Sequence, residues 1–134
     1  MPEYRKITII RYRAPSKKDL NEEIRWLCGS LGLFSLRDKD SSCYRVFIEL
    51  LKGTKADTPF SSDSIAKNLG LSRGTVVHHI NHLMESGIVV SEKNRYLLRV
   101  SNLQSLIDEI EKDVKEASSE LRRIAKEIDR ELGL

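Results

Sequence analysis

The stretch FSSDSIAKNLGLSRGTVVHHINHLMESGIVV, residues 60–90, decides the fold of this chain. Ser61 or Ser62 is suited to cap a first short helix, and Gly70 supplies the left-handed position that ends it. Ser72 is suited to cap a second helix directly after the turn. Two short helices joined by a tight turn predict a helix-turn-helix.

The second helix of this motif has one apolar face. Val76, Ile80 and Leu83 recur at helical spacing with His79 beside them, so we expect this face to be buried. Gly87 ends the helix, and the opposite face is left to contact another molecule.

A hairpin is predicted after the second helix. Residues 88–100 contain two strand-like runs around Glu92–Arg95, and Asn94 suits a turn position with positive φ. We also expect a short strand at Thr58–Phe60 to pair with this hairpin. A hairpin in this position is the wing of a winged helix, so residues 43–100 are predicted to be a winged helix-turn-helix domain of the mainly α (α+β) class.

The first 42 residues are predicted to form an extension made of a strand and a helix. Tyr4–Tyr12 is rich in β-branched and aromatic residues, which favours a strand. Ser16 is suited to cap a helix that runs to Leu31 and ends at Gly32. The inward-facing residues of this helix are Leu20, Ile24, Leu27, Cys28 and Leu31.

The winged-helix domain is predicted to follow a connector at Leu33–Ser42 and to open with a helix from about Cys43 to Lys52. Gly53 is expected to terminate this helix, and Thr54–Pro59 to form a loop. The inward-facing residues are Val46, Phe47, Leu50 and Leu51.

Composition and charge narrow the class of protein. The chain has 134 residues, 40% of them hydrophobic, which suffices for an ordinary core. The net charge is +3, but residues 103–134 carry nine acidic and six basic residues, so the part that holds the helix-turn-helix has the basic excess. No apolar run is long enough to cross a bilayer and no leader peptide pattern occurs, which predicts a cytoplasmic protein. Cys28 and Cys43 are expected to be reduced and buried.

The last segment, residues 101–134, carries a heptad pattern. Apolar residues step alternately by four and three, which is typical of a coiled-coil helix. A helix of about 30 residues would be ~45 Å long. It is too long to bury its apolar stripe on one small domain, so we expect a homodimer. The stripe, called the heptad seam below, consists of Leu103, Ile107, Ile110, Val114, Ala117, Leu121, Ile124 and Ile128.

The geometry of this pairing stays open at the level of sequence. Leu106, Ala125 and Leu132 widen the stripe, and few opposite charges flank it. A parallel pair, an antiparallel pair, and a seam shared with the helix at 16–31 of either subunit are all compatible with the pattern.

The order helix, helix, turn, helix, hairpin from Cys43 to Val100 resembles the winged-helix transcriptional regulators of the ArsR-like type. The string LGLSRGTVVHHINHLMESGIV, residues 69–89, is similar to the recognition-helix segment of that family. The resemblance implies a dimer that binds operator DNA and that often responds to a metal or another signal. The metal box of the family places cysteine on the first helix of the motif, whereas Ile65–Leu69 carries none.

The exposed face of the second helix is predicted to read double-stranded DNA from the major groove. Arginine can grip guanine and asparagine can grip adenine through two hydrogen bonds, while valine can meet a thymine methyl group. A glycine lets the backbone approach closely, hydroxyls at a helix amino terminus suit a phosphate, and basic residues of the wing suit the flanking backbone or the minor groove. The predicted DNA-binding residues are Ser72, Arg73, Gly74, Thr75, Val77, His78, Asn81, Lys93 and Arg95.

The histidines of the second helix invite a metal interpretation that we do not favour. His78 and His82 are one turn apart, but no HExxH arrangement occurs and both cysteines are distant in sequence. We expect His79 to pack beside the core and His78 and His82 to face DNA or solvent, so we predict no metal and no cofactor. No phosphate-binding loop or nucleophile elbow is found, so we predict no enzymatic activity.

The sequence thus predicts a sequence-specific DNA-binding transcriptional regulator that acts as a homodimer. The rival interpretation is a protein-interaction adaptor whose long carboxy-terminal helix docks on another polypeptide. The operator, the direction of regulation and any effector are not specified by these patterns.

Overall fold

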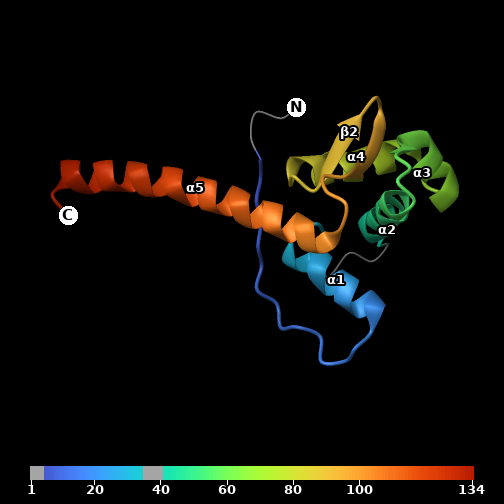
Figure 1. Cartoon of the computed structure of the whole chain (residues 1–134), viewed down its shortest axis with the longest axis horizontal. Coiled ribbons are helices and arrows are strands. Elements are labelled where there is room, and N and C mark those ends of the chain that lie inside the picture. The colour runs from blue at the N-terminus through green and yellow to red at the C-terminus, as the bar shows by residue number, and fades with distance from the viewer. Residues whose placement is uncertain (1–4, 35–40) are drawn as a thin grey trace.

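A computed structural model describes residues 5–34 and 41–134 of the chain. Figure 1 shows a helical domain with a small sheet, from which one long helix extends. The elements in chain order are α1 (Leu20–Ser30), α2 (Ser42–Lys55), β1 (Phe60–Ser61), α3 (Ser62–Leu69), α4 (Arg73–Glu85), β2 (Val89–Glu92), β3 (Arg95–Leu98) and α5 (Leu103–Leu132).

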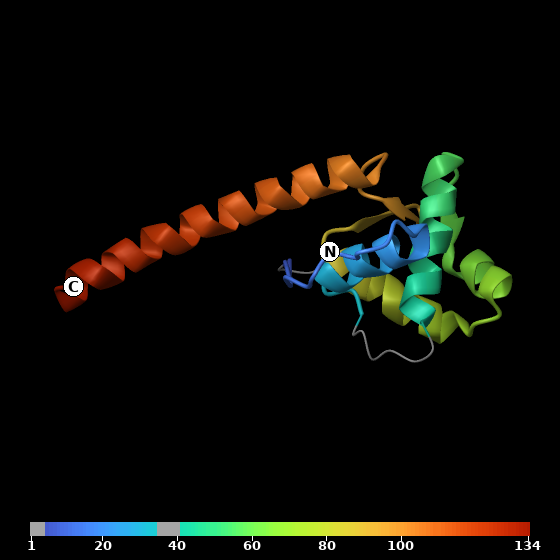
Figure 2. The ribbon, with the colours of Figure 1, turned by 90° about the horizontal axis from the view of Figure 1, so that it is seen from below.

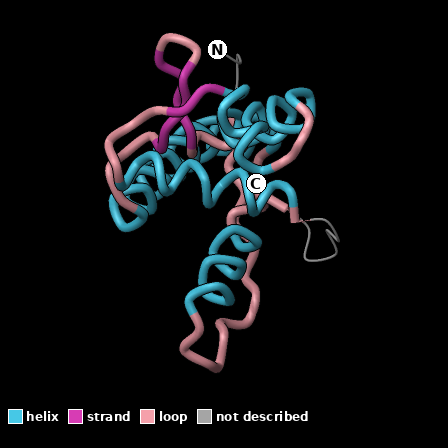
Figure 3. Tube along the Cα trace, turned by 90° about the vertical axis from the view of Figure 1, so that its right-hand side faces the viewer, coloured by secondary structure: helices cyan, strands magenta, loops and turns pink. Residues whose placement is uncertain are grey.

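The three strands form one antiparallel sheet in the order β1–β3–β2. Lys93 and Asn94 join β2 to β3, and their φ angles of 52° and 63° match a two-residue hairpin turn. Phe60 lies opposite Tyr96, so β1 extends the hairpin into a third strand. The predicted wing and its pairing strand are therefore confirmed, with the strand beginning at the last predicted residue. Figure 3 shows the hairpin in magenta, standing out from the helices.

The helix-turn-helix also follows the prediction. Ser61 caps α3 by accepting a hydrogen bond from the Ser64 backbone, and Gly70 ends the helix with a φ of 67°. Ser72 caps α4, and Gly87 follows its end with a φ of 76°. With the sheet and the long α5, these elements confirm the mainly helical winged helix-turn-helix fold.

The hydrophobic core lies between α2, α3, α4, the sheet and the beginning of α5. The prediction that one face of α4 is buried is confirmed, because Val76, Ile80 and Leu83 each have an exposed fraction of 1% or less. The other largest side chains that are almost fully buried are Phe47, Leu50, Ile65, Ile88, Leu98 and Leu106. Cys28 and Cys43 are buried, as expected.

The amino-terminal strand was predicted wrongly. Tyr4 lies outside the described residues, and residues 5–12 form no strand. Their backbone groups bond to helix ends instead, with Lys6 N donating to Glu85 O at 3.0 Å and Ile10 N donating to Ser30 O at 2.7 Å. The segment therefore runs along helix ends and does not join a sheet. Residues 35–40 of the predicted connector also lie outside the described part.

Two predicted helix ends are corrected. Asp19, not Ser16, caps α1, because its carboxylate accepts a hydrogen bond from Glu22 N at 3.2 Å. α2 does not stop at Gly53 but runs to Lys55. A Cβ at Gly53 would lie 2.7 Å from the Thr58 carbonyl oxygen, so this glycine serves close packing within the helix.

α5 leaves the domain after its first half. Leu106 and Ile110 are buried against the core, whereas all residues from Ser119 to the carboxyl end are exposed. Figure 2 shows this second half projecting beyond the domain. Among the described residues, no helix is long and apolar enough to cross a membrane.

Candidate nucleic-acid interface

α4 presents an exposed polar face on the side opposite the core. Gly74, His78 and Asn81 are exposed along this face, and Val77 lies half-buried at its flank. The helix is held by its apolar side, so the outer residues are left on a rigid element at a defined spacing. Four residues of the predicted DNA-binding set therefore lie on one surface of α4, namely Gly74, Val77, His78 and Asn81.

The amino terminus of α4 is already capped within the protein. The Ser72 hydroxyl accepts a hydrogen bond from Thr75 N at 3.1 Å and lies 2.8 Å from the Thr75 hydroxyl. Both hydroxyls were predicted to suit a phosphate, and both are engaged with each other here. Because Thr75 N is used by the cap, a phosphate at this end would meet the backbone N–H groups of Arg73 and Gly74.

Arg73 lies next to an acidic side chain of α3. Its Nε atom is 3.2 Å from the Asp63 carboxylate, and both side chains are more than 70% exposed. An ion pair this exposed contributes little to stability, about 0–1 kcal/mol. The pairing therefore holds Arg73 in place only weakly, and the guanidinium can exchange the carboxylate for another acceptor.

The described residues give no structural reason for a glycine at position 74. Its φ is not in the left-handed region, and a Cβ built there would meet nothing within 4 Å. Glycine inside a helix costs roughly 0.5–1 kcal/mol relative to alanine. The missing side chain therefore points to a close approach by something outside the described chain.

Two of the three histidines of α4 are used inside the protein. A hydrogen bond of 2.6 Å joins His79 Nε2 to the Ser42 hydroxyl, and His82 Nε2 donates to the Gly32 carbonyl at 3.2 Å. His79 is thus half-buried beside the core as expected, whereas His82 was expected to face DNA or solvent and does not. Only His78 of the three is exposed. Among the described residues, no group of three potential metal ligands is found.

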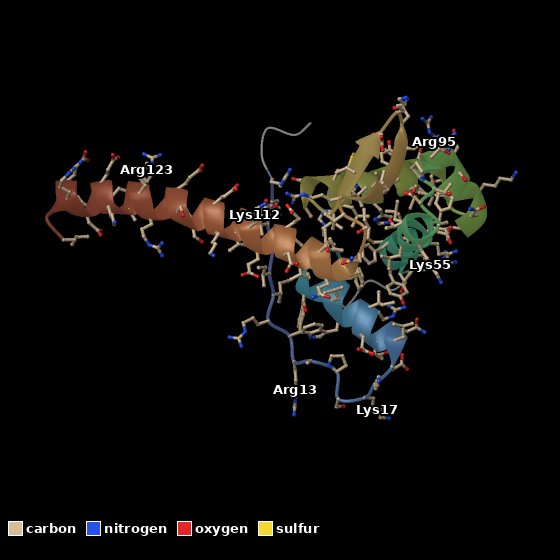
Figure 4. The ribbon with its side chains drawn as sticks, in the orientation of Figure 1. Arg13, Lys17, Lys55, Arg95, Lys112 and Arg123 are labelled. Atoms are coloured by element: carbon tan, nitrogen blue, oxygen red, sulfur yellow. The ribbon has the colours of Figure 1, made fainter. Side chains whose placement is uncertain are left out.

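The wing places its basic residues at an exposed tip. Lys93 lies in the turn and Arg95 begins β3, and both are exposed. The Arg95 guanidinium lies 3.5 Å from the Pro59 carbonyl, which leaves most of its donors unused. Figure 4 shows Arg95 on the hairpin side of the domain, far from Arg123 on the outer part of α5.

An ion cluster fastens the base of the wing to α5. The Arg99 guanidinium, just after β3, donates to the Asp113 carboxylate at 2.7 and 3.3 Å and to Glu109 at 3.3 Å. Arg5 reaches the same Asp113 carboxylate at 3.1 Å. The hydrogen bond from Arg99, with a smaller effect from Arg5, lowers the pKa of Asp113 below its usual range. This cluster makes the wing, α5 and the amino-terminal segment one unit.

Sequence reasoning missed this cluster. Arg99 and Asp113 lie in different elements, fourteen positions apart, and Arg5 is more than a hundred positions away. Pairs at helical spacing can be recognised from sequence, but no periodicity links these three residues. An isolated arginine at the end of the second wing strand was the only available signal.

The heptad seam divides into two parts. Leu103, Ile110 and Val114 pack on the hydrophobic core of their own chain, so this part of the seam already contacts its own domain. The second part projects into solvent, with Leu121, Ile124 and Ile128 exposed by 72%, 43% and 49%. α1 and the first half of α5 line one apolar groove, which agrees with the alternative of a seam shared with that helix.

Taken together, the capped turn, the exposed face of α4 and the basic hairpin define a winged helix-turn-helix protein. A protein-family model described as an HTH domain matches residues 47–97, from within α2 to β3. The match supports a DNA-binding domain of the kind used in transcription regulation. No curated protein and no solved structure matches the chain.

Proposed function

We propose that the chain is a sequence-specific regulator of transcription that binds double-stranded DNA as a homodimer. α4 enters the major groove with its exposed face, and the wing contacts the flanking backbone. The observation that carries this proposal is Gly74, an exposed helical glycine with open space around it, beside Arg73, His78 and Asn81. The HTH domain match supports DNA as the partner.

Base contacts and phosphate contacts are assigned to different residues. Arg73 and Asn81 read base edges, because their side chains can form paired hydrogen bonds to guanine and adenine. Lys93 and Arg95 contact phosphates or the minor groove, where their charge acts without regard to sequence. The ArsR-like kinship of residues 69–89 and a cytoplasmic location are part of the same proposal.

The test is titration of the full chain against a duplex selected from a random pool, at several salt concentrations. Asn81→Ala should cost about 1–3 kcal/mol and relax the preference at one base pair. Lys93→Ala should weaken binding to all duplexes alike and reduce the salt slope by about one. Lys112→Ala is the matched control, because Lys112 lies on α5 outside α4 and the wing (Figure 4). Equal, sequence-independent losses in all three variants would contradict the assignment of base-reading roles.

A second candidate function follows from the exposed half of α5. Its apolar stripe could dock on another polypeptide, which would make the protein an adaptor built on a winged helix. That function predicts a heteromeric complex and no salt-dependent affinity for DNA. The same titration, together with the mass of the purified particle, therefore separates the two.

A further inference from the structure

An open apolar groove lies between the amino-terminal segment, α1 and the first half of α5. It has a volume of about 430 Å³. Ile9 and Ile107 on its rim are exposed by 59% and 37%, so the domain alone does not cover them. The apolar residues that line the groove are Ile9, Trp26, Leu27, Leu31, Ile107, Ile110 and Val114.

The second half of α5 has the matching feature, which is a row of exposed apolar side chains. Leu121, Ile124, Ile128 and Leu132 are all exposed on this half of the helix. Moving aliphatic side chains of this size from water into an apolar site is favourable. The groove and the projecting half of the helix both lie along the same α5.

We infer that two copies of the chain pair antiparallel along α5, so that the projecting half of each α5 fills the groove of the other copy. This inference rests on the proposed homodimer and specifies its geometry. In a single copy the groove is open on one side, and in the pair the second copy covers that side.

The order of residues in the heptad seam favours this register. In an antiparallel pair, the two kinds of core position in a heptad meet each other across the interface. With Ile107 level with Ile124 of the second copy, every seam residue meets an apolar partner. The four pairs are Leu103 with Ile128, Ile107 with Ile124, Ile110 with Leu121, and Val114 with Ala117.

The distribution of charge favours the same direction. Residues 103–116 carry five acidic and two basic side chains, whereas residues 117–126 carry one acidic and three basic ones. An antiparallel pair sets the basic stretch of one copy beside the acidic stretch of the other. A parallel pair sets the two acidic stretches side by side, which like-charge repulsion disfavours.

The register also sets the spacing of the two domains. Leu103, where α5 joins the wing, lies level with Ile128 of the second copy, about 25 residues along the helix. At 1.5 Å per residue the two wing junctions are ~38 Å apart along the pair. Half-sites one helical turn apart on B-DNA are separated by about 34–36 Å. A parallel pair would place both junctions at the same level.

Cysteine cross-linking in the full chain tests the direction of pairing. In the antiparallel register, Ile107→Cys in one copy faces Ile124→Cys in the other, so the double variant should give mostly disulfide-linked dimer after treatment with diamide. Each single variant alone places its two sulfurs ~25 Å apart along the pair, beyond the Cα separation of about 4–7 Å that a disulfide allows. Both positions are partly exposed, and the native cysteines are buried, so the unsubstituted chain is the control that stays unlinked.

The outcomes are distinct. Linkage in the double variant and in a mixture of the two single variants, but in neither single variant alone, is the expected result. Linkage of each single variant with itself shows parallel pairing and overturns the inference while the proposed homodimer stands. A monomer by light scattering, or a complex with a different polypeptide, overturns both the inference and the homodimer. DNA affinity, measured separately by titration, tests the regulatory function independently.

Discussion

Single residues of α4 serve either the fold or the outer surface, and the structure separates the two groups. Ser72, His79 and His82 make hydrogen bonds inside the domain. Gly74, His78 and Asn81 have no such role among the described residues and face outward. Substitutions in the second group should therefore change binding without damaging the fold.

Gly74→Ala should change stability and DNA affinity in opposite directions. Because a methyl group at this position meets nothing within 4 Å, alanine should stabilise the free protein by up to about 1 kcal/mol. The same methyl group should obstruct the approach of DNA and weaken binding roughly tenfold, about 1.4 kcal/mol. Thermal unfolding and DNA titration of one preparation measure both effects. A more stable variant with unchanged DNA affinity would remove Gly74 from the interface.

At the scale of elements, the contact between the wing and α5 centres on the Asp113 carboxylate. Asp113 is mostly buried and accepts hydrogen bonds from Arg99 and Arg5, so its loss takes one partner from each cation and leaves Arg99 with Glu109. The wing would then be held to α5 by the Arg99–Glu109 pair, apolar contacts and the chain connection.

Asp113→Asn should lower the free energy of unfolding by about 1–3 kcal/mol near neutral pH. Since the pKa of Asp113 is lowered in the folded state, its contribution is fully present above the ordinary carboxyl range, near pH 4. It is lost as pH falls through the lowered pKa, so the stabilities of wild type and variant should converge in acid. Denaturant unfolding from pH 7 to pH 2 checks this. Asp108→Asn is the control, because Asp108 is exposed on the same helix, and an equal effect there would argue against a specific cluster.

At the scale of the whole molecule, the proposed dimer makes operator affinity depend on the projecting half of α5. Removal of all of α5 would also take Leu106 and Ile110 out of the core, so a point substitution in the exposed half is the cleaner experiment.

Leu121→Asp should leave the domain folded and give a monomer, because Leu121 is 72% exposed in a single chain. It should lose most of the operator affinity that depends on two linked recognition helices and keep the non-specific affinity of one domain. Ser119→Asp adds the same charge on the opposite face of the helix and should behave as wild type. Light scattering beside operator titration makes the comparison, and a Leu121→Asp dimer with full affinity would exclude this half of α5 from the interface.

The sequence alone determined the features that depend on close neighbours. The caps at Ser61 and Ser72, the positive φ at Gly70 and Asn94, and the buried face of α4 all follow from residues a few positions apart. Local preferences and helical or strand periodicity carry this information directly. The exposed face of α4 could be predicted for the same reason, since the buried face of a helix also defines its exposed face.

Only the tertiary structure decided the features that depend on distant parts of the chain. The heptad pattern is continuous, but packing on the domain buries Ile110 and half-buries Leu103 and Val114, whereas the second half of the seam is exposed. Gly53 lies inside α2, where the Thr58 carbonyl oxygen leaves no room for a Cβ atom. The His82 side chain turns inward because its ring donates a hydrogen bond to the Gly32 carbonyl. The segment at residues 5–12 has the composition of a strand, yet the backbone N–H groups of Lys6 and Ile10 donate to carbonyl groups at helix ends. In each case the deciding contact joins groups that no local pattern relates, and burial and hydrogen bonding then override intrinsic preference.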